Sequence, residues 1–94
     1  MQITDIKIRK LFDNDPLRAI VSVTFDDALA VHDIKIIHTS ASGRHFVVMP
    51  SRKGADGAFH DIVHPINSAF REQLEGAVLE AYHVKLAVEQ EVEA

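Results

Sequence analysis

The sequence has no cysteine among its 94 residues, so it can form neither a disulfide bond nor a thiolate metal site. This absence fits a reducing compartment, and we expect a cytoplasmic protein. No apolar run approaches the length of about 18 residues that a membrane-spanning helix needs. No basic segment followed by an apolar run opens the chain, so we expect neither a signal peptide nor contact with a membrane.

The sequence also lacks the common catalytic patterns. Its four glycines are scattered and form no phosphate-binding loop. Ser51 beside Arg52, and Ser68 near His64, have no third group that would orient a nucleophile and its base. We therefore expect no enzymatic activity and no cofactor.

Aromatic residues make up 6% of the chain, which is few for a protein that stacks bases along a single strand. Phe46 and Phe59 fall in predicted strands, where we expect them to pack in the core.

A chain of 94 residues forms one domain, residues 1–94, with a small core. Association of two copies would bury further apolar surface. We therefore expect a homodimer or a higher homo-oligomer.

The net charge is −4, which by itself argues against a nucleic-acid partner. The charges are unevenly distributed, however. Residues 1–53 hold eight cations and six acids, whereas residues 54–94 hold two cations and eight acids. The first part is therefore mildly basic, and local potential rather than net charge steers a polyanion.

Alternation of apolar and polar residues predicts an antiparallel meander of about five strands within residues 1–63. The predicted strands cover residues 2–11, 17–25, 29–36, 44–49 and 58–63. The apolar phase slips inside the third strand, which predicts a β-bulge near His32 and Asp33.

From Asn67 the apolar period becomes helical, and we predict one long helix over residues 67–88. The fold class is thus α+β. Such a helix is about 30 Å long, more than a sheet of short strands needs as cover, so part of its apolar stripe is expected to meet another subunit. The acidic tail, residues 89–94, is expected to fray because acids are unfavourable at a helix C-terminus.

The segment that joins sheet and helix holds the most specific pattern of the chain. Pro50 has no N–H to donate and ends a strand, which leaves Ser51–Lys53 on a predicted loop with its cations exposed. Asp56–Gly57 is a turn signal, Pro65 closes the next strand, and Asn67 is placed to cap the helix.

This pattern resembles the SpoVG family of small bacterial regulators (stage V sporulation protein G, or septation regulator). The resemblance extends over about residues 1–83 and includes Thr4–Asp5, Arg18–Ile20, Val31–Ile34, Met49–Lys53, Asp56–Gly57, Phe59, Asp61–Ile62, His64–Ser68, Ala77–Leu79 and Tyr82. It implies a regulator that binds DNA, RNA or both and influences gene expression, septation or sporulation.

The candidate nucleic-acid contacts are the cations of the predicted sheet and of the helix start: Lys7, Arg9, Lys10, Arg18, Arg52, Lys53 and Arg71. The alternative interpretation is that these cations lie on an ordinary solvated strand surface and contact no nucleic acid. Arg71 could instead pair with Glu75 one helical turn later. The family commonly has a cation where this chain has Gln73, so binding here could be weaker or use another face.

His60 and His64 have a spacing that suits a metal on a helix, but they fall on a predicted strand. We expect no metal site, and we expect the His64 ring to bond the backbone at the turn before the helix. An alternative function is a protein-interaction module that regulates division without contacting nucleic acid, through the helix or a sheet edge.

Overall fold

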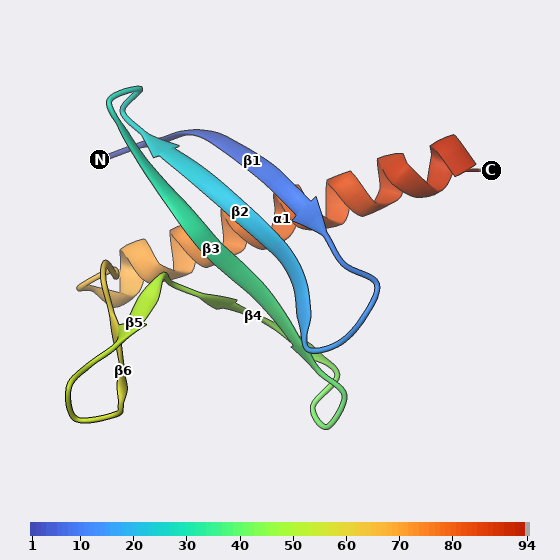
Figure 1. The fold of residues 1–94 in the computed structure, drawn as a ribbon. Coiled ribbons are helices and arrows are strands. Elements are labelled where there is room, and N and C mark those ends of the chain that lie inside the picture. The colour runs from blue at the N-terminus through green and yellow to red at the C-terminus, as the bar shows by residue number, and fades with distance from the viewer. Residues whose placement is uncertain (94) are drawn as a thin grey trace.

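A computed structural model describes the backbone of residues 1–93 and the side chains of residues 1–89. Strands β1 (Ile3–Leu11), β2 (Leu17–Phe25), β3 (Leu29–Thr39) and β4 (Arg44–Val48) form an antiparallel sheet in the order β1-β2-β3-β4. Strands β5 (Ser51–Lys53) and β6 (Phe59–Asp61) form a separate two-stranded sheet, and helix α1 (Ser68–Glu93) follows. The α+β class is as predicted, and Figure 1 shows the helix crossing behind the sheet.

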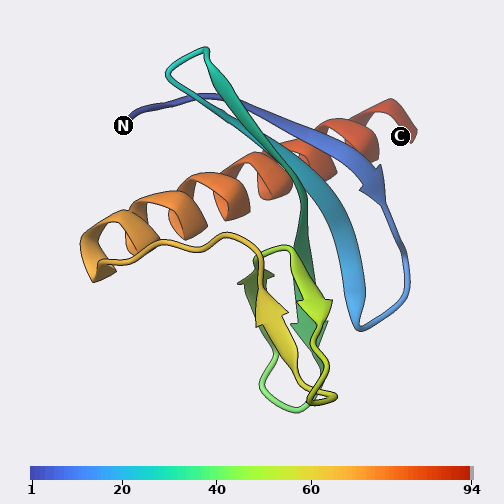
Figure 2. The same ribbon diagram turned by 60° about the vertical axis from the view of Figure 1, so that its left-hand side comes forward.

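The prediction of one continuous meander was wrong at its last strand. Residues 59–61 pair with residues 51–53, which we expected to be a loop, and not with the main sheet. The local hydrogen bonds explain the switch: the carbonyl of Pro50 accepts a bond from the N–H of Ile62 at 2.7 Å, so the chain folds back on itself. Gly57, at φ +83°, supplies the predicted turn. The hairpin stands beyond β4 (Figure 2).

The predicted bulge in the third strand is confirmed. Val21 pairs with Ile34 and Val23 pairs with Val31, so His32 and Asp33 both lie opposite one residue of β2. Asp33 takes the positive φ of 63°. Because of the bulge, Val31, Ile34 and the later apolar core residue of β3, Ile36, all face the helix.

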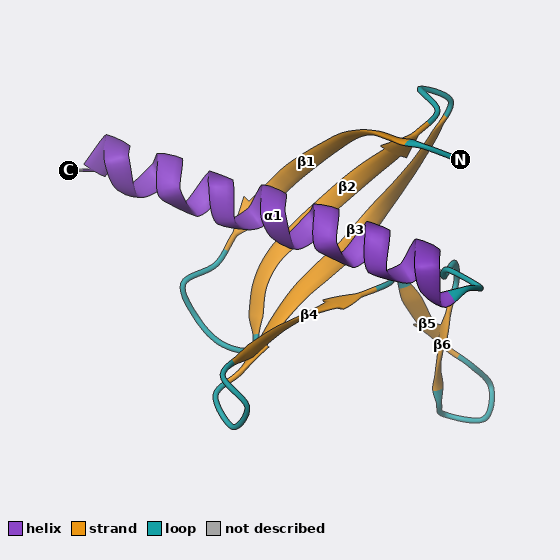
Figure 3. Ribbon diagram, turned by 180° about the vertical axis from the view of Figure 1, so that it is seen from behind, coloured by secondary structure: helices purple, strands orange, loops and turns teal. Residues whose placement is uncertain are grey.

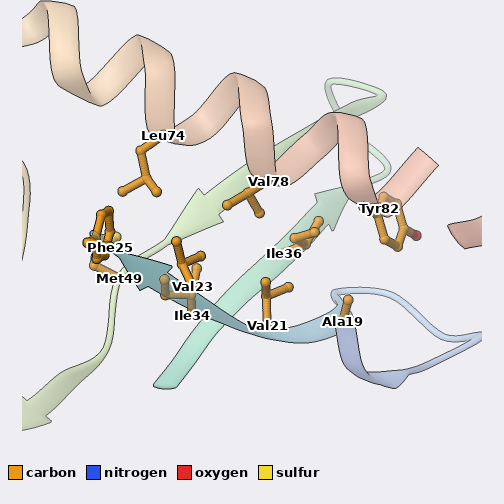
Figure 4. Packing of buried hydrophobic residues seen from close by; sticks show 10 residues of the cluster. All are labelled: Ala19, Val21, Val23, Phe25, Ile34, Ile36, Met49, Leu74, Val78 and Tyr82. Carbon is orange, nitrogen blue, oxygen red and sulfur yellow. The ribbon is translucent and has the colours of Figure 1, made fainter. Parts of the chain in front are cut away.

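The core lies between one face of the four-stranded sheet and α1 (Figure 3). The helix contributes Leu74, Val78 and Tyr82 at steps of four residues, which form one side of the predicted apolar stripe. Their side chains point to the alternating apolar residues of β2 and β3 in Figure 4, all fully or nearly fully buried: Ala19, Val21, Val23, Phe25, Ile34 and Ile36.

The two ends of the helix differ in how well they were predicted. At the start, the side-chain oxygen of Asn67 accepts a bond from the N–H of Phe70 at 2.7 Å, which confirms the cap. At the other end, α1 runs to Glu93 rather than to residue 88, so the tail expected to fray is helical through that residue. The Lys85 ammonium lies 3.3 Å from the Glu89 carboxylate, an i, i+4 pair that favours this extension.

Candidate nucleic-acid interface

The first candidate cations lie on the edge strand β1. Its isoleucines face the helix, and Lys7 and Arg9 are exposed on the opposite side, as the alternation predicted. The Arg9 guanidinium donates from Nε to the hydroxyl of Ser22 at 3.2 Å, and that hydroxyl lies 2.9 Å from Nδ1 of His32. Arg9 is thereby oriented on the surface of the sheet that the helix does not cover.

Lys10 and Arg18 lie near the far end of the same strand pair but in different settings. The ammonium of Lys10 lies 5.1 Å from the centre of the Phe12 ring, a cation–π distance. Arg18 donates to the Tyr82 hydroxyl at 3.4 Å and to the Asp13 carbonyl at 3.1 Å. The bond to Tyr82 is the main reason that the pKa of Arg18 is raised. Arg18 thus links the β1–β2 turn to the helix.

Arg52 and Lys53 form the second exposed group, on β5. Arg52 pairs with His60 across the hairpin, and Lys53 pairs with Phe59. The loop between the strands is held by Asp56, which accepts a bond from the N–H of Ala58 at 3.0 Å. That bond, followed by the contact with His60, lowers the pKa of the Asp56 carboxyl.

Arg71 forms the ion pair with Glu75 that the sequence spacing allowed. Its guanidinium lies 3.7 Å from the Glu75 carboxylate and donates to the carbonyl of Pro65 at 3.3 Å. Both contacts tie it to the start of α1. Arg71 therefore has intramolecular partners that Arg52 and Lys53 do not share among the described residues.

The structure does not bring the seven candidates into one patch. The β1 group lies on one edge strand of the sheet, and the β5 group follows the other edge strand, β4. Between them lie two exposed cations that our selection left out, Lys35 on β3 and Arg44 on β4. Alternation could have identified both, because Lys35 separates the core residues Ile34 and Ile36 and so must face away from the helix.

The expected core positions of two aromatic residues were wrong. Phe46 is 43% exposed and Phe59 is 73% exposed. Phe46 pairs with Ile37, whereas its neighbour Val47 pairs with the buried Ile36, so Phe46 faces away from the core. Phe59 is exposed because its strand belongs to the hairpin, which no helix covers.

The histidines near the hairpin have local roles. Nε2 of His60 lies 3.2 Å from the Asp56 carboxylate. Nδ1 of His64 donates to the carbonyl of Pro65 at 3.0 Å, which confirms the expected backbone contact. In the part of the chain that the structure describes, no three metal-binding side chains gather into a possible site.

A long groove separates β1 from the exposed side of α1. It has a volume of about 1160 Å³ and is lined by Ile3, Ile6 and Ile8 on the strand and by Ala77, Ala81, Val84 and Val88 on the helix, with polar residues of both elements around them. Val84 is 58% exposed there. The groove is the part of the helix stripe that the chain's own sheet leaves uncovered. None of the helices described is long and apolar enough to cross a membrane.

Comparison with known protein sequences assigns the chain to a family. The SpoVG family profile matches residues 1–84. The chain belongs to the SpoVG family. A relative from Desulforudis audaxviator is 51% identical, with 95% of this chain and 99% of the relative covered. One from Clostridium beijerinckii is 51% identical over 98% and 97%, and one from Clostridioides difficile is 50% identical over 92% and 91%. All three carry the name "Putative septation protein SpoVG".

Proposed function

We propose that this SpoVG-family chain is a non-enzymatic regulator that binds nucleic acid and acts as a homodimer. The observation that carries the proposal is the state of its exposed cations. Among the described side chains, carboxylates pair with Arg18, Arg71 and Lys85, and not with Lys7, Arg9, Arg52 or Lys53. Cations without a carboxylate partner keep their charge available for phosphate oxygens.

Most acids of the second part of the chain lie on α1, behind the sheet. On β1, Lys7, Arg9 and Lys10 outnumber Asp5. On the hairpin, Arg52 and Lys53 lie beside Asp56 and Asp61, and the Asp56 carboxylate is engaged by Ala58 and His60. A polyanion approaching β1 therefore meets more cations than acids despite the net charge of −4.

Fluorescence anisotropy with mixed-sequence DNA and RNA oligonucleotides across a salt series tests the proposal. Binding should weaken log-linearly with salt, and Arg52→Ala with Lys53→Ala should reduce the slope by about two. Arg71→Ala removes a cation that already pairs with Glu75 and lies outside the groove between β1 and α1, and it should leave the slope unchanged. No binding at about 50 mM salt would refute the proposal, and an unchanged slope in the double variant would place the contacts elsewhere.

The second copy of the chain would occupy the groove between β1 and α1. The groove combines an apolar stripe with an edge strand, and its rim carries both signs of charge, Asp5 and Glu80 against Lys85. Such a surface is complementary to itself under two-fold rotation. Two copies would present two cationic surfaces, whose weak contacts reinforce each other through effective concentration.

Sedimentation velocity tests this arrangement. Val84→Glu places a charge in the groove and should shift the protein from the dimer to the monomer mass. Ile66→Glu is the matched control, because Ile66 is 90% exposed and lies outside the groove. A dimer that persists in the Val84 variant, or a monomeric native protein, would exclude this interface.

One observation favours the alternative function, a protein-interaction module. Ile62 and Ile66 are exposed beside an apolar pocket of about 320 Å³ lined by residues such as Leu29, Val63 and Phe70. A protein partner that uses this pocket should be captured after nuclease treatment and lost in the Ile66→Glu variant. Capture that is abolished by nuclease would support the nucleic-acid function instead.

A further inference from the structure

The face of the four-stranded sheet turned away from α1, which we call the open face, has an unusual composition. Strand pairing places Lys10, Ile20, Lys35 and Val48 in one row that crosses all four strands. Cationic and apolar side chains therefore alternate across the sheet. In the next row, Ile37 pairs with Phe46, and beyond it Thr39 pairs with Arg44.

The apolar members of this face are accessible. Phe46 is 43% exposed and Val48 is 39% exposed. Neither belongs to the core or to the partly buried residues packed against it. Phe46 lies between Arg44 and Val48 on the same side of β4, so an exposed aromatic ring stands beside a guanidinium.

The charge on the open face selects the class of ligand. Lys7, Arg9, Lys10, Lys35 and Arg44 are exposed there against two acids, Asp5 and, in the bulge opposite Ser22, Asp33. An anionic backbone that also carries flat apolar groups matches this mixture. Nucleic acid has both, since every base has a π-face and every linkage has a phosphate.

A single strand fits the open face better than a duplex does. A duplex keeps its bases stacked inside, and its grooves accept a helix or a two-stranded ribbon rather than the flat of a four-stranded sheet. An exposed phenylalanine on an edge strand of such a sheet, as Phe46 is on β4, has a stacking partner only when a base is unpaired.

The open face also joins the two separate groups of candidate cations. The row from Lys10 ends at Val48, and three residues later the chain enters β5. There Lys53 pairs directly with Phe59, which repeats the combination of a cation and an exposed ring. A single-stranded nucleic acid that runs along this row from β1 to the hairpin therefore meets the cations of the row, passes beside Phe46, and reaches Lys53 and Phe59.

We infer that a single-stranded nucleic acid binds across the open face, with its phosphates on Lys10, Lys35 and Arg44 and one base stacked on Phe46. The inference rests on the proposed nucleic-acid function and adds to it the strand form and the surface. Phe46 is then a binding residue that the cation pattern alone does not reveal.

Anisotropy with labelled single-stranded RNA and DNA and with a duplex of the same sequence tests the inference. The single strands should bind more tightly than the duplex. Phe46→Ala should weaken single-strand binding roughly 5- to 150-fold, the range expected for one lost base stack, with little change in the salt slope. Phe46→Tyr keeps a ring and should retain binding. Leu29→Ala, an exposed apolar residue outside the open face, is the matched control.

A second pair of variants tests the phosphate contacts. Lys35→Ala with Arg44→Ala should lower the salt slope by about two without changing the melting temperature, since both side chains are exposed. A 2-aminopurine base in the strand should show fluorescence quenching that the Phe46→Ala variant loses and Phe46→Tyr keeps.

The outcomes separate this inference from the proposed function. If the native protein binds and the Arg52/Lys53 variant is weakened while Phe46→Ala is not, the open face is excluded and the function stands. Equal or tighter binding of the duplex overturns the single-strand inference. If Phe46→Ala changes the oligomeric mass, the face is covered by a second copy, which also overturns it. Absence of all binding removes both proposals.

Discussion

The Tyr82 hydroxyl accepts a hydrogen bond from Nε of Arg18 at 3.4 Å, and this contact joins the middle of α1 to the start of β2. Tyr82 is fully buried, so its hydroxyl depends on a protein partner. The same guanidinium holds the β1–β2 turn through the Asp13 carbonyl and the Asp15 carboxylate. One side chain therefore fixes the helix, a strand and a turn relative to one another.

Removal of that hydroxyl should lower the stability of the protein. Tyr82→Phe keeps the packed ring and loses the bond to Arg18, and because the bond is long we expect a loss of about 1 kcal/mol in the free energy of unfolding. Urea denaturation measures it. In the Arg18→Leu background the same Tyr82→Phe change should have a smaller effect, and equal effects in both backgrounds would show that the two residues are not coupled.

Arg18 should also behave differently from the other candidate cations in binding assays. Its guanidinium already has three protein partners, so Arg18→Leu should reduce the melting temperature and leave the salt slope of nucleic-acid binding unchanged. Arg52→Ala should leave the melting temperature unchanged and lower the salt slope. A slope that falls by about one in the Arg18 variant, with an unchanged melting temperature, would place Arg18 on the binding surface.

Local patterns predicted much of this fold. The bulge at Asp33 followed from a phase slip, and the helix start followed from Asn67 and the change of period. The pairing of residues 59–61 with residues 51–53 did not follow, because alternation describes faces and not partners. Asp56–Gly57 signals the turn between the two segments, but the backbone bond from Ile62 to Pro50, which helps to fix their pairing, has no signal of its own in the sequence.

The candidate site shows the same limit. Each cation that we selected from β1 is on the exposed face, and the predicted meander already sets β1 at one edge of the sheet; the position of the β5 group depends on the separate β5–β6 hairpin, which alternation did not predict. The exposure of Phe46 could have been predicted, since it shares its phase with Arg44, and an arginine on a strand indicates the solvent side. We predicted a core position for Phe46 instead because aromatic residues usually pack in the core.

The stability of the sheet–helix junction should depend on pH through His45. Its ring packs 4.7 Å from that of His38 and 5.7 Å from that of His83, between β3, β4 and α1. Burial is the main reason that the pKa of His45 is lowered, and His38, His83 and Arg18 lower it further, while Asp15 opposes them. Protonation of His45 is thus less favourable in the folded protein than in the unfolded chain.

The unfolded chain therefore takes up this proton first as the pH falls below the ordinary value of 6.5. Stability should be unaffected by this group above that pH and should decrease as the pH falls below it. Urea midpoints at several pH values measure the decrease, and His45→Gln should reduce it. Parallel pH profiles of the native and His45→Gln proteins would contradict the assignment.

The helix cap should contribute measurably to stability. Asn67→Ala removes the acceptor for the N–H of Phe70 and should lower the free energy of unfolding by about 1 kcal/mol. Asn67→Asp keeps an acceptor and should retain most of the stability. A loss as large in the aspartate variant as in the alanine variant would mean that packing around Asn67, and not the cap, is responsible.

The hairpin that carries Arg52 and Lys53 should depend on Gly57 for its shape. A Cβ at this position meets no atom within 4 Å, so the cost of Gly57→Ala comes from the positive φ of 83° and not from a clash. We expect the β5–β6 pairing to loosen while the four-stranded sheet stays intact, since the two sheets are separate. Hydrogen exchange should become faster at the N–H of Gly54, which bonds the Ala58 carbonyl, and stay slow in β2.

If the two cations contact phosphate, nucleic-acid affinity should fall in the same variant although no charge is lost. Gly76→Ala, at an open helical position, is the control for a general effect of alanine. Faster exchange at Gly54 with unchanged affinity would show that the hairpin does not need its folded shape to bind.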